Sequence, residues 1–137
     1  MLVVNLAAVT FAAHRSFRGL QTLKENEGPE QEARIKLYRE VRLPKWMAFY
    51  ESVLKYNRVK RGCTTGWVVG DEVSFADLAL FLMCEGIRTK LPEDYDKHAP
   101  EGSLLRAHHE QVKARPRVAA FFASDRLPKY VLDCPGT

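Results

Sequence analysis

The apolar positions of this chain recur with the spacing of α-helices. Residues 2 to 24 predict the first helix, whose first half is apolar on nearly all sides. Its second half keeps a single apolar stripe made of Phe17, Leu20 and Leu23. No Lys or Arg precedes the apolar start, so a helix of the domain is favoured over a signal peptide. The apolar stretch is also too short for a membrane span.

A second long helical stretch is predicted for residues 30 to 57, after a break that carries Gly28 and Pro29. Pro44 interrupts this stretch, and it either kinks one helix or begins the second of two. A core-facing stripe follows the i, i+3, i+4, i+7, i+8 spacing, for which ordinary core packing is favoured over a ligand cage. Its members are Trp46, Phe49, Tyr50, Val53 and Leu54.

The most explicit helix start lies at Ser74. Asp77 follows three residues later, which is the spacing of a capping box with Asp in place of the more common Glu. The helix is predicted to run to about Thr89, and residues 78 to 84 are seven apolar residues in a row. A helix that is apolar on every side is typically buried, so this one is predicted to be the central helix. Ser74 and Asp77 are therefore assigned a structural N-cap role.

The remaining segments predict a loop, two shorter helices and an irregular tail. Residues 90 to 102 contain two prolines and mixed charges, which predicts a loop. Residues 103 to 114 predict a short amphipathic helix, and Pro116 can be the first residue of the next one. The tail from Arg126 is predicted to be irregular. Without any strand pattern, the predicted fold class is all-α, a multi-helix orthogonal bundle of roughly five to six helices in one domain, residues 1–137.

Composition and charge narrow the function classes. A chain of 137 residues, 46% hydrophobic and 28% charged, suits one soluble globular domain. The net charge of +4 is spread along the chain. A solvated helix end or loop explains the densest basic cluster, Arg58, Lys60 and Arg61, better than nucleic-acid binding does. An odd number of cysteines without a C-x-x-C pair predicts free thiols in a reducing, cytoplasmic compartment. These are Cys63, Cys84 and Cys134, of which Cys84 lies in an apolar run and is predicted to be buried.

No group of residues in the sequence forms a recognisable catalytic pattern. His108 and His109 are adjacent, and helical neighbours point about 100° apart, so they are poorly placed to hold one metal ion. No second Cys or His pair completes a zinc set, and no metal is expected. Glu93, Asp94 and Asp96 share one predicted loop, where solvation is favoured over acid–base chemistry. Phosphate-loop, dinucleotide-binding and nucleophile-elbow signatures are absent from the sequence.

Three segments of the sequence resemble the all-helical C-terminal domain of cytosolic glutathione transferases. The segment VVGDEVSFADLALF at residues 68 to 81 resembles the signature of that domain. The segment KARPRVAAFFAS at residues 113 to 124 is similar to one near the family's C-terminus, and LPKWMAFYESVLKYN at residues 43 to 57 is similar to the helix before the signature. They occur in the expected order, span most of the chain and resemble the sigma, pi, mu and alpha classes.

The resemblance implies a divided function. Such enzymes activate glutathione with a Tyr, Ser or Cys of an N-terminal thioredoxin-like domain, to which no residue here maps. That domain is therefore an expected partner absent from these residues, and no catalytic residue is assigned. The helical domain contributes the wall of the pocket for small electrophilic substrates. By helical phase, the matching substrate-binding residues are Ser16, Gly19, Leu20, Leu23, Tyr130 and Val131.

Two functions from different classes follow from the resemblance. The first is the electrophile-binding domain of a detoxifying glutathione transferase, with glutathione as co-substrate, no resident cofactor, and a homodimer as the expected assembly. Neither nucleic acid nor membrane is an expected partner. The alternative is a non-catalytic interaction module, as in elongation factor or aminoacyl-tRNA synthetase complexes. Ala12 and Ala13 stand where several classes place an acidic residue that helps to hold glutathione, which favours the module, whereas the S-F-A-D and A-R-P matches favour the enzyme.

Overall fold

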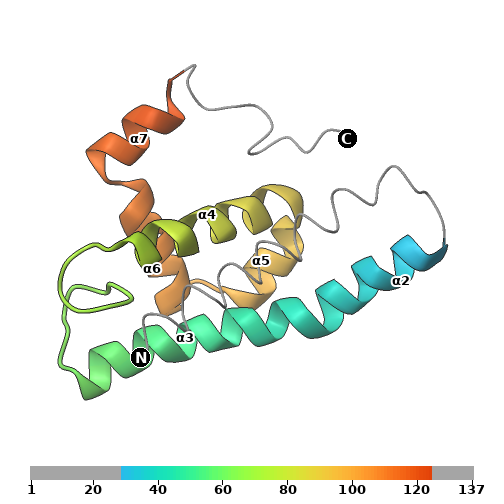
Figure 1. Cartoon of the computed structure of the whole chain (residues 1–137), viewed down its shortest axis with the longest axis horizontal. Helices are drawn as coiled ribbons and strands as arrows, with labels where there is room; N and C mark the ends of the chain where they lie inside the picture. Colours follow the sequence, from blue (N-terminus) through green and yellow to red (C-terminus); the bar gives the residue numbers. More distant parts are fainter. Residues whose placement is uncertain (1–28, 125–137) are drawn as a thin grey trace.

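The computed structural model describes residues 29–124, and these residues are helical without any strand (Figure 1). This confirms the all-α prediction. The predicted helix at residues 2 to 24 and the tail from Arg126 lie outside the described residues. The elements are α2 (Pro29–Leu37), η2 (Tyr38–Arg42, a π-helical turn), α3 (Leu43–Lys60), α4 (Phe75–Lys90), α5 (Pro92–His98), α6 (Leu104–Lys113) and α7 (Pro116–Phe122).

The elements α2, η2 and α3 follow one another without a break and form one long rod (Figure 1). Pro44 has no amide proton, so it cannot donate to the carbonyl four residues earlier. The chain accommodates this with the π-helical turn just before it, in which the Leu43 amide donates to the Tyr38 carbonyl five residues earlier. Leu43 itself keeps helical backbone angles. Pro44 therefore modifies one helical rod and does not divide it into two.

The buried face of α3 differs from the predicted stripe. Tyr50 and Leu54 are buried as predicted, but Phe49 is 40% exposed, which contradicts its assignment to the core. The apolar positions of α3 cover a wider arc than α5 and α6 can bury, so the apolar pattern alone does not locate the contact. The residues of α3 that are buried are Leu43, Met47, Tyr50, Leu54 and Asn57.

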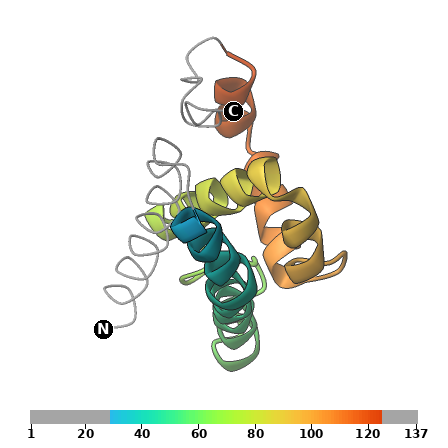
Figure 2. The ribbon, with the colours of Figure 1, turned by 90° about the vertical axis from the view of Figure 1, so that its right-hand side faces the viewer.

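The other helices pack on one side of the rod. Helix α6 contacts both α3 and α4, helix α5 contacts the same two helices, and α7 packs on α6. Helix α4 crosses the rod obliquely, as the two views together show (Figures 1 and 2). A smaller cluster of Trp67, Phe81 and Val112 joins the loop before α4 to α4 and α6. The main core comprises Tyr38, Leu43, Met47, Tyr50, Leu54, Val68, Leu80, Cys84, Ile87, Tyr95, Ala99 and Leu105.

Helix α4 begins where predicted but is not buried on all sides. Leu80 and Cys84 are fully buried, which confirms the prediction for Cys84. Phe75, Leu78 and Leu82 share the opposite face and are 81%, 39% and 50% exposed. Within the described residues, α5 and α6 cover one face of α4, so the seven apolar residues in a row do not imply burial all round.

The segment predicted as a loop at residues 90 to 102 contains helix α5. Pro92 lies in its first turn, where a missing amide proton is harmless. Acidic residues in the first turn and basic residues in the last turn complement the helix dipole. Seven residues are too few to show an apolar period, which is why the sequence pattern missed this helix.

Two acidic residues of α5 are paired rather than merely solvated. Arg39 Nε donates to Asp94 Oδ2 at 2.7 Å, which links α5 to η2. Asp96 forms an ion pair with Arg106 of α6. These ion pairs were not predicted from the sequence, because the partners Arg39 and Arg106 are 55 and 10 residues away from the carboxylates.

Asp77 joins the start of α4 to the preceding loop and to α6. Its Oδ2 accepts hydrogen bonds from the Ser74 amide at 2.7 Å and the Ser74 hydroxyl at 2.8 Å, and the capping box predicted from the sequence is present. Its Oδ1 accepts the Val68 amide at 2.8 Å and lies 2.9 Å from His108 Nε2. The carboxylate is fully buried, and these contacts occupy both of its oxygens.

Asp77 remains charged although it is buried. Burial alone would raise the pKa of Asp77, but hydrogen bonds from His108, Val68 and Ser74 outweigh it and hold that pKa below its usual range. Asp77 is therefore ionised at neutral pH. An ionised carboxylate can only accept, so Nε2 of His108 carries the proton in this contact.

The start of α6 is held by a side chain from α3. Glu51 accepts the backbone amides of Leu104 and Leu105 at 2.9 and 2.8 Å. These amides have no acceptor within their own helix, and a negative charge suits the positive end of the helix dipole. Ser103 adds a local cap by accepting the Arg106 amide at 3.2 Å. The Glu51 contacts thus tie α6 to the rod.

We expect Asp77→Asn to lower the free energy of unfolding by about 3 kcal/mol, because buried donors that lose an acceptor cost about 1–3 kcal/mol each. The exposed Asp71, in the turn before Ser74, provides a matched control. Asp71→Asn should cost less than about 0.5 kcal/mol, as is usual for surface substitutions. Urea unfolding followed by circular dichroism measures both variants, and equal losses would contradict the role given to Asp77.

We expect Glu51→Ala to lower the free energy of unfolding by about 1–3 kcal/mol, since two amides at the start of α6 lose their acceptor. Glu40→Ala is the matched control, because Glu40 is exposed on the same rod. Hydrogen exchange should show faster exchange at Leu104 and Leu105 in Glu51→Ala alone. Unchanged protection of these two amides would argue against the cap.

Candidate functional site

The two adjacent histidines of α6 contact different carboxylates of α4. His108 Nε2 lies 2.9 Å from Asp77 Oδ1, and His109 Nε2 lies 2.8 Å from Glu85 Oε2. Both imidazole rings are fully buried. Neighbouring side chains on a helix point about 100° apart, so the two rings reach carboxylates about two turns apart on α4. We call these contacts the carboxylate–histidine pairs.

His109 also contacts a third helix. Its Nδ1 lies 3.0 Å from the hydroxyl oxygen of Tyr95 on α5. Since the Glu85 carboxylate can only accept, Nε2 carries the proton and Nδ1 accepts from the Tyr95 hydroxyl. The ring of Phe81 stacks on the imidazole with centroids 5.2 Å apart. We call this chain of two hydrogen bonds the Tyr95–His109–Glu85 relay.

The relay has a defined charge state at neutral pH. Burial would raise the pKa of Glu85, but the hydrogen bonds and charge of Arg88, with Lys113 and His109, outweigh it and leave that pKa below its usual range. Arg88 donates to both Glu85 oxygens, at 3.1 and 2.7 Å. Burial lowers the pKa of His109, although the charge of Glu85 opposes this effect. Glu85 is therefore ionised and His109 neutral.

The relay has the connectivity of a nucleophile, base and acid, but it is closed to substrates. In hydrolases a hydroxyl, an imidazole and a carboxylate in this order activate the hydroxyl for attack. Tyr95 is only 2% exposed here and His109 is 0% exposed, so no substrate can reach the hydroxyl oxygen. Burial also raises the pKa of Tyr95, which keeps it protonated. The arrangement therefore serves the helix interface rather than catalysis.

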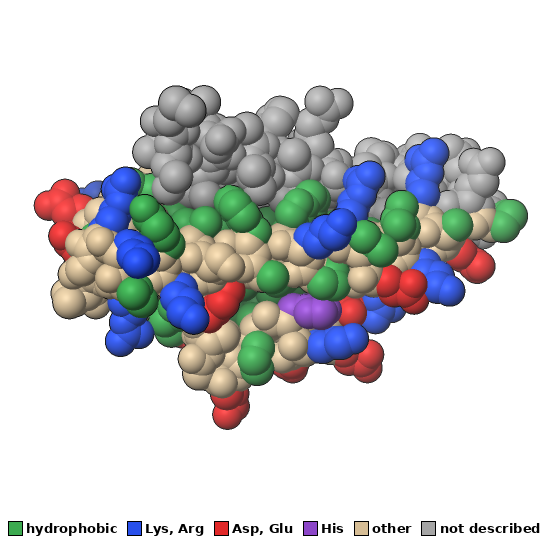
Figure 3. All heavy atoms as spheres, turned by 90° about the horizontal axis from the view of Figure 1, so that it is seen from below, with side chains coloured by type: hydrophobic (Ala, Val, Ile, Leu, Met, Phe, Trp, Pro, Cys, Tyr) green, Lys and Arg blue, Asp and Glu red, His purple; other side chains and the backbone are tan. Residues whose placement is uncertain are grey.

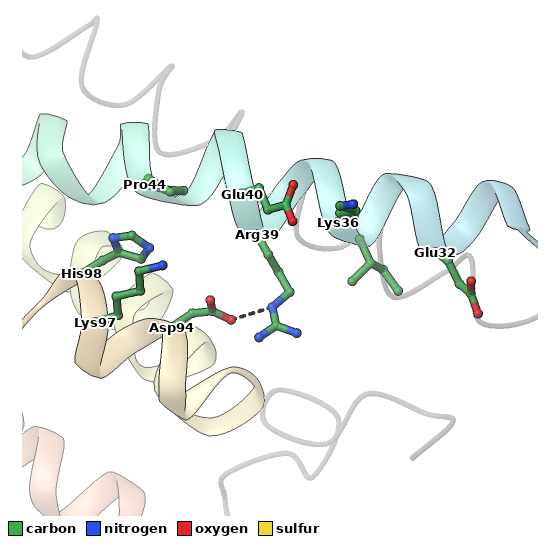
Figure 4. A pocket seen from close by; sticks show the side chains of 9 residues that line it. Glu32, Lys36, Arg39, Glu40, Pro44, Asp94, Lys97 and His98 are labelled. Atoms are coloured by element: carbon green, nitrogen blue, oxygen red, sulfur yellow. Dashed lines mark hydrogen bonds and ion pairs between the residues drawn. The ribbon is translucent and has the colours of Figure 1, made fainter.

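An open pocket of about 470 Å³ lies between the rod and α5 (Figure 4). The ion pair between Arg39 and Asp94 spans it, as the dashed line shows. Three Lys or Arg side chains and three carboxylates line it, so its charges nearly balance and it favours neither anions nor cations. Its lining residues are Glu32, Ile35, Lys36, Arg39, Glu40, Pro44, Asp94, Lys97 and His98.

Between residues 29 and 124, no three His, Cys, Asp or Glu side chains come together in a way that could hold a metal ion. None of the helices in that range combines the length and apolar character needed to cross a membrane.

The residues predicted to bind substrate remain predictions. Ser16, Gly19, Leu20, Leu23, Tyr130 and Val131 all lie outside the described residues. The structural N-cap formed by Ser74 and Asp77 is confirmed.

Tyr95 and Glu85 of the relay were not predicted from the sequence, where His109 was considered only as a metal ligand. Glu85 directly follows the apolar run of α4, and a charged residue in a helix predicted to be buried needs a partner. That signal could have pointed to Glu85. Its partner His109 is 24 residues away, and only the packing of α6 on α4 reveals it.

Comparison with known proteins identifies relatives of this helical domain. Residues 15–125 match the family model described as "Glutathione S-transferase, C-terminal domain". The glutathione S-transferase of Plasmodium falciparum (isolate 3D7) is 32% identical over 88 residues, which cover 64% of this chain and 40% of that protein. The glutathione S-transferase of Plasmodium yoelii yoelii is 29% identical over 117 residues, which cover 85% of this chain and 47% of that protein.

The chain matches less than half the length of either relative. The family match, in contrast, covers most of this chain and includes all the helices described above. The all-helical fold and the capping box at the start of α4 agree with the expectation from the sequence. This chain therefore belongs to the glutathione S-transferase family, in which it corresponds to the C-terminal domain.

Proposed function

We propose that this chain is the electrophile-binding domain of a cytoplasmic glutathione transferase, and that conjugation requires an N-terminal thioredoxin-like domain joined to it. The observation that carries this proposal is the family match over residues 15–125. The relatives, both named glutathione S-transferase, extend well beyond the matched segment, which supports an active unit larger than this domain.

The chemistry of the proposed reaction is divided between the two domains. The thioredoxin-like domain would stabilise the thiolate of glutathione, and the helical domain would position the electrophile against an apolar wall. The described cysteines and the relay support this division, because none of them is suited to activating a thiol. Cys63 and Cys84 are buried free thiols, and burial raises the pKa of Cys84 to about 12.

Two exposed apolar stripes support contact with other parts of a larger enzyme. The first follows the rod, where Figure 3 shows apolar side chains between Lys and Arg side chains. The second is the open face of α4. Large exposed apolar patches commonly mark interaction sites. We assign these stripes to the thioredoxin-like domain and to the second subunit of a homodimer. They comprise Leu37, Val41, Phe49, Tyr56 and Val59 on the rod, and Phe75, Leu78 and Leu82 on α4.

The experiment compares the chain alone with the chain fused behind the thioredoxin-like half of a relative. Glutathione conjugation to an aryl halide and retention on glutathione resin are measured for both proteins, with the thioredoxin-like half alone as control. We expect activity in the fusion, at least tenfold above either half, because both substrates are positioned only there.

Two outcomes would overturn the proposal. Either the chain alone conjugates as fast as the fusion, or a folded, dimeric fusion binds glutathione but conjugates no electrophile. In the second case, retention of the chain on a purified elongation factor or aminoacyl-tRNA synthetase subunit would favour the interaction module instead.

A further inference from the structure

His109 connects α4, α5 and α6 through hydrogen bonds that require its neutral form. Nε2–H donates to Glu85 on α4, and the unprotonated Nδ1 accepts from Tyr95 on α5. The ring is fully buried and stacks on Phe81, which in turn makes an edge-to-face contact with Phe122 of α7, with centroids 5.5 Å apart. A change in the protonation of this ring therefore alters its contacts with both α4 and α5.

A proton added to Nδ1 conflicts with the hydrogen bond from Tyr95. Two donors would then face each other across 3.0 Å, so the hydroxyl proton would have to turn away. Within residues 29–124 the Tyr95 hydroxyl has no second hydrogen-bond partner. The protonated form thus leaves a buried donor without an acceptor, unless α5 or α6 moves to admit water.

The charged groups around the ring oppose one another. Glu85 from α4 attracts a proton to His109, and so does Glu110 of α6, whose Oε1 lies 3.7 Å from Nδ1. Arg88 of α4 and Lys113 of α6 already compensate Glu85, with Lys113 Nζ 3.8 Å from its Oε1. The thiol of Cys84 and the hydroxyl of Tyr95 stay neutral, because burial raises the pKa of each. Desolvation of the imidazole prevails, and the pKa of His109 lies below its usual value.

We propose that His109 makes the packing of α4, α5 and α6 sensitive to acid. The neutral imidazole holds the three helices together, and protonation of the ring loosens their packing. The proposal is independent of the proposed function, since it concerns how this domain holds together.

The sign of the pH dependence follows from linkage. The unfolded chain takes up a proton on His109 near pH 6.5, the ordinary value, whereas the folded chain does so only at lower pH. The stabilisation that depends on neutral His109 is therefore fully present above about pH 6.5. It is lost as the pH falls toward the pKa of His109 in the folded chain. One proton changes the unfolding equilibrium constant by up to about tenfold per pH unit. Asp77 and Glu85, whose pKa values are lowered, act in a separate window below about pH 4.5.

The test compares wild type with His109→Gln in the full chain, by urea unfolding between pH 7.5 and 5.5. A glutamine amide can still donate toward Glu85 but does not titrate in this range. His98→Gln is the matched control, because His98 lies at the end of α5, beside the open pocket. The contact of His108 with Asp77 is unchanged in both variants, so the difference between their slopes isolates His109.

We expect the unfolding constant of wild type and His98→Gln to rise several-fold more between pH 6.5 and 5.5 than that of His109→Gln. Hydrogen exchange corrected for the intrinsic rate should show that α5 and α6 open before α3 as the pH falls. Equal slopes in all three proteins would overturn the proposal.

A second measurement covers the case in which His109→Gln does not fold. The His109 ring of wild type is titrated by NMR while the amide signals of α5 and α6 are followed. We expect the ring to titrate below pH 6.5 together with the loss of these amide signals. Titration of the ring with unchanged α5 and α6 signals would overturn the proposal.

Discussion

The structure depends on one constraint: the carboxylates that α4 buries must be satisfied. An unpaired buried charge costs several kcal/mol, which is a large part of the stability of a domain of this size. Asp77 has donors in Ser74 and Val68, and Glu85 has one in Arg88. Each carboxylate gains a further partner when α6 lies across α4, with His108 opposite Asp77 and His109 opposite Glu85. Because the two histidines are adjacent, a shift of α6 by one residue would separate both pairs. The carboxylate–histidine pairs therefore fix the register of α6, whereas apolar contacts alone would tolerate sliding.

Further polar contacts connect the other elements to the interface between α4 and α6. Glu51 attaches the start of α6 to the rod, Tyr95 attaches α5 to the buried ring, and the Val68 amide attaches the loop before α4 to Asp77. Within residues 29–124, these interior polar groups hold helices together, and none of them is open to a substrate. The apolar side chains exposed on the rod and on α4 are the surfaces that we propose to contact a thioredoxin-like domain and a second subunit.

The parts of the fold that could be predicted from sequence depend on local signals. The capping box of Ser74 and Asp77 predicts the start of α4, and Pro116 predicts the start of α7. Both starts are confirmed. Helix α5 has seven residues and too few apolar positions to show a period, so it was missed. The exposed face of α4 was missed for a different reason, since neighbours decide which apolar residues are covered.

The candidate site was less predictable than the fold. Asp77 was assigned to a cap, but its contact with His108 spans 31 residues of sequence and depends on how α6 packs. Similarity to a family supplied what these local patterns could not, namely the kind of domain, and the predicted electrophile-binding residues rest on that similarity alone.

The role of the carboxylate–histidine pairs is tested most directly by which nitrogen of each histidine ring carries the proton at pH 7, read from the nitrogen-15 signals of the side chains. We expect Nε2 to carry the proton in both rings, and both protons to exchange slowly with solvent because each is hydrogen-bonded to a buried carboxylate. A proton on Nδ1 alone in either ring, or exchange as fast as that of a free imidazole, would contradict that role.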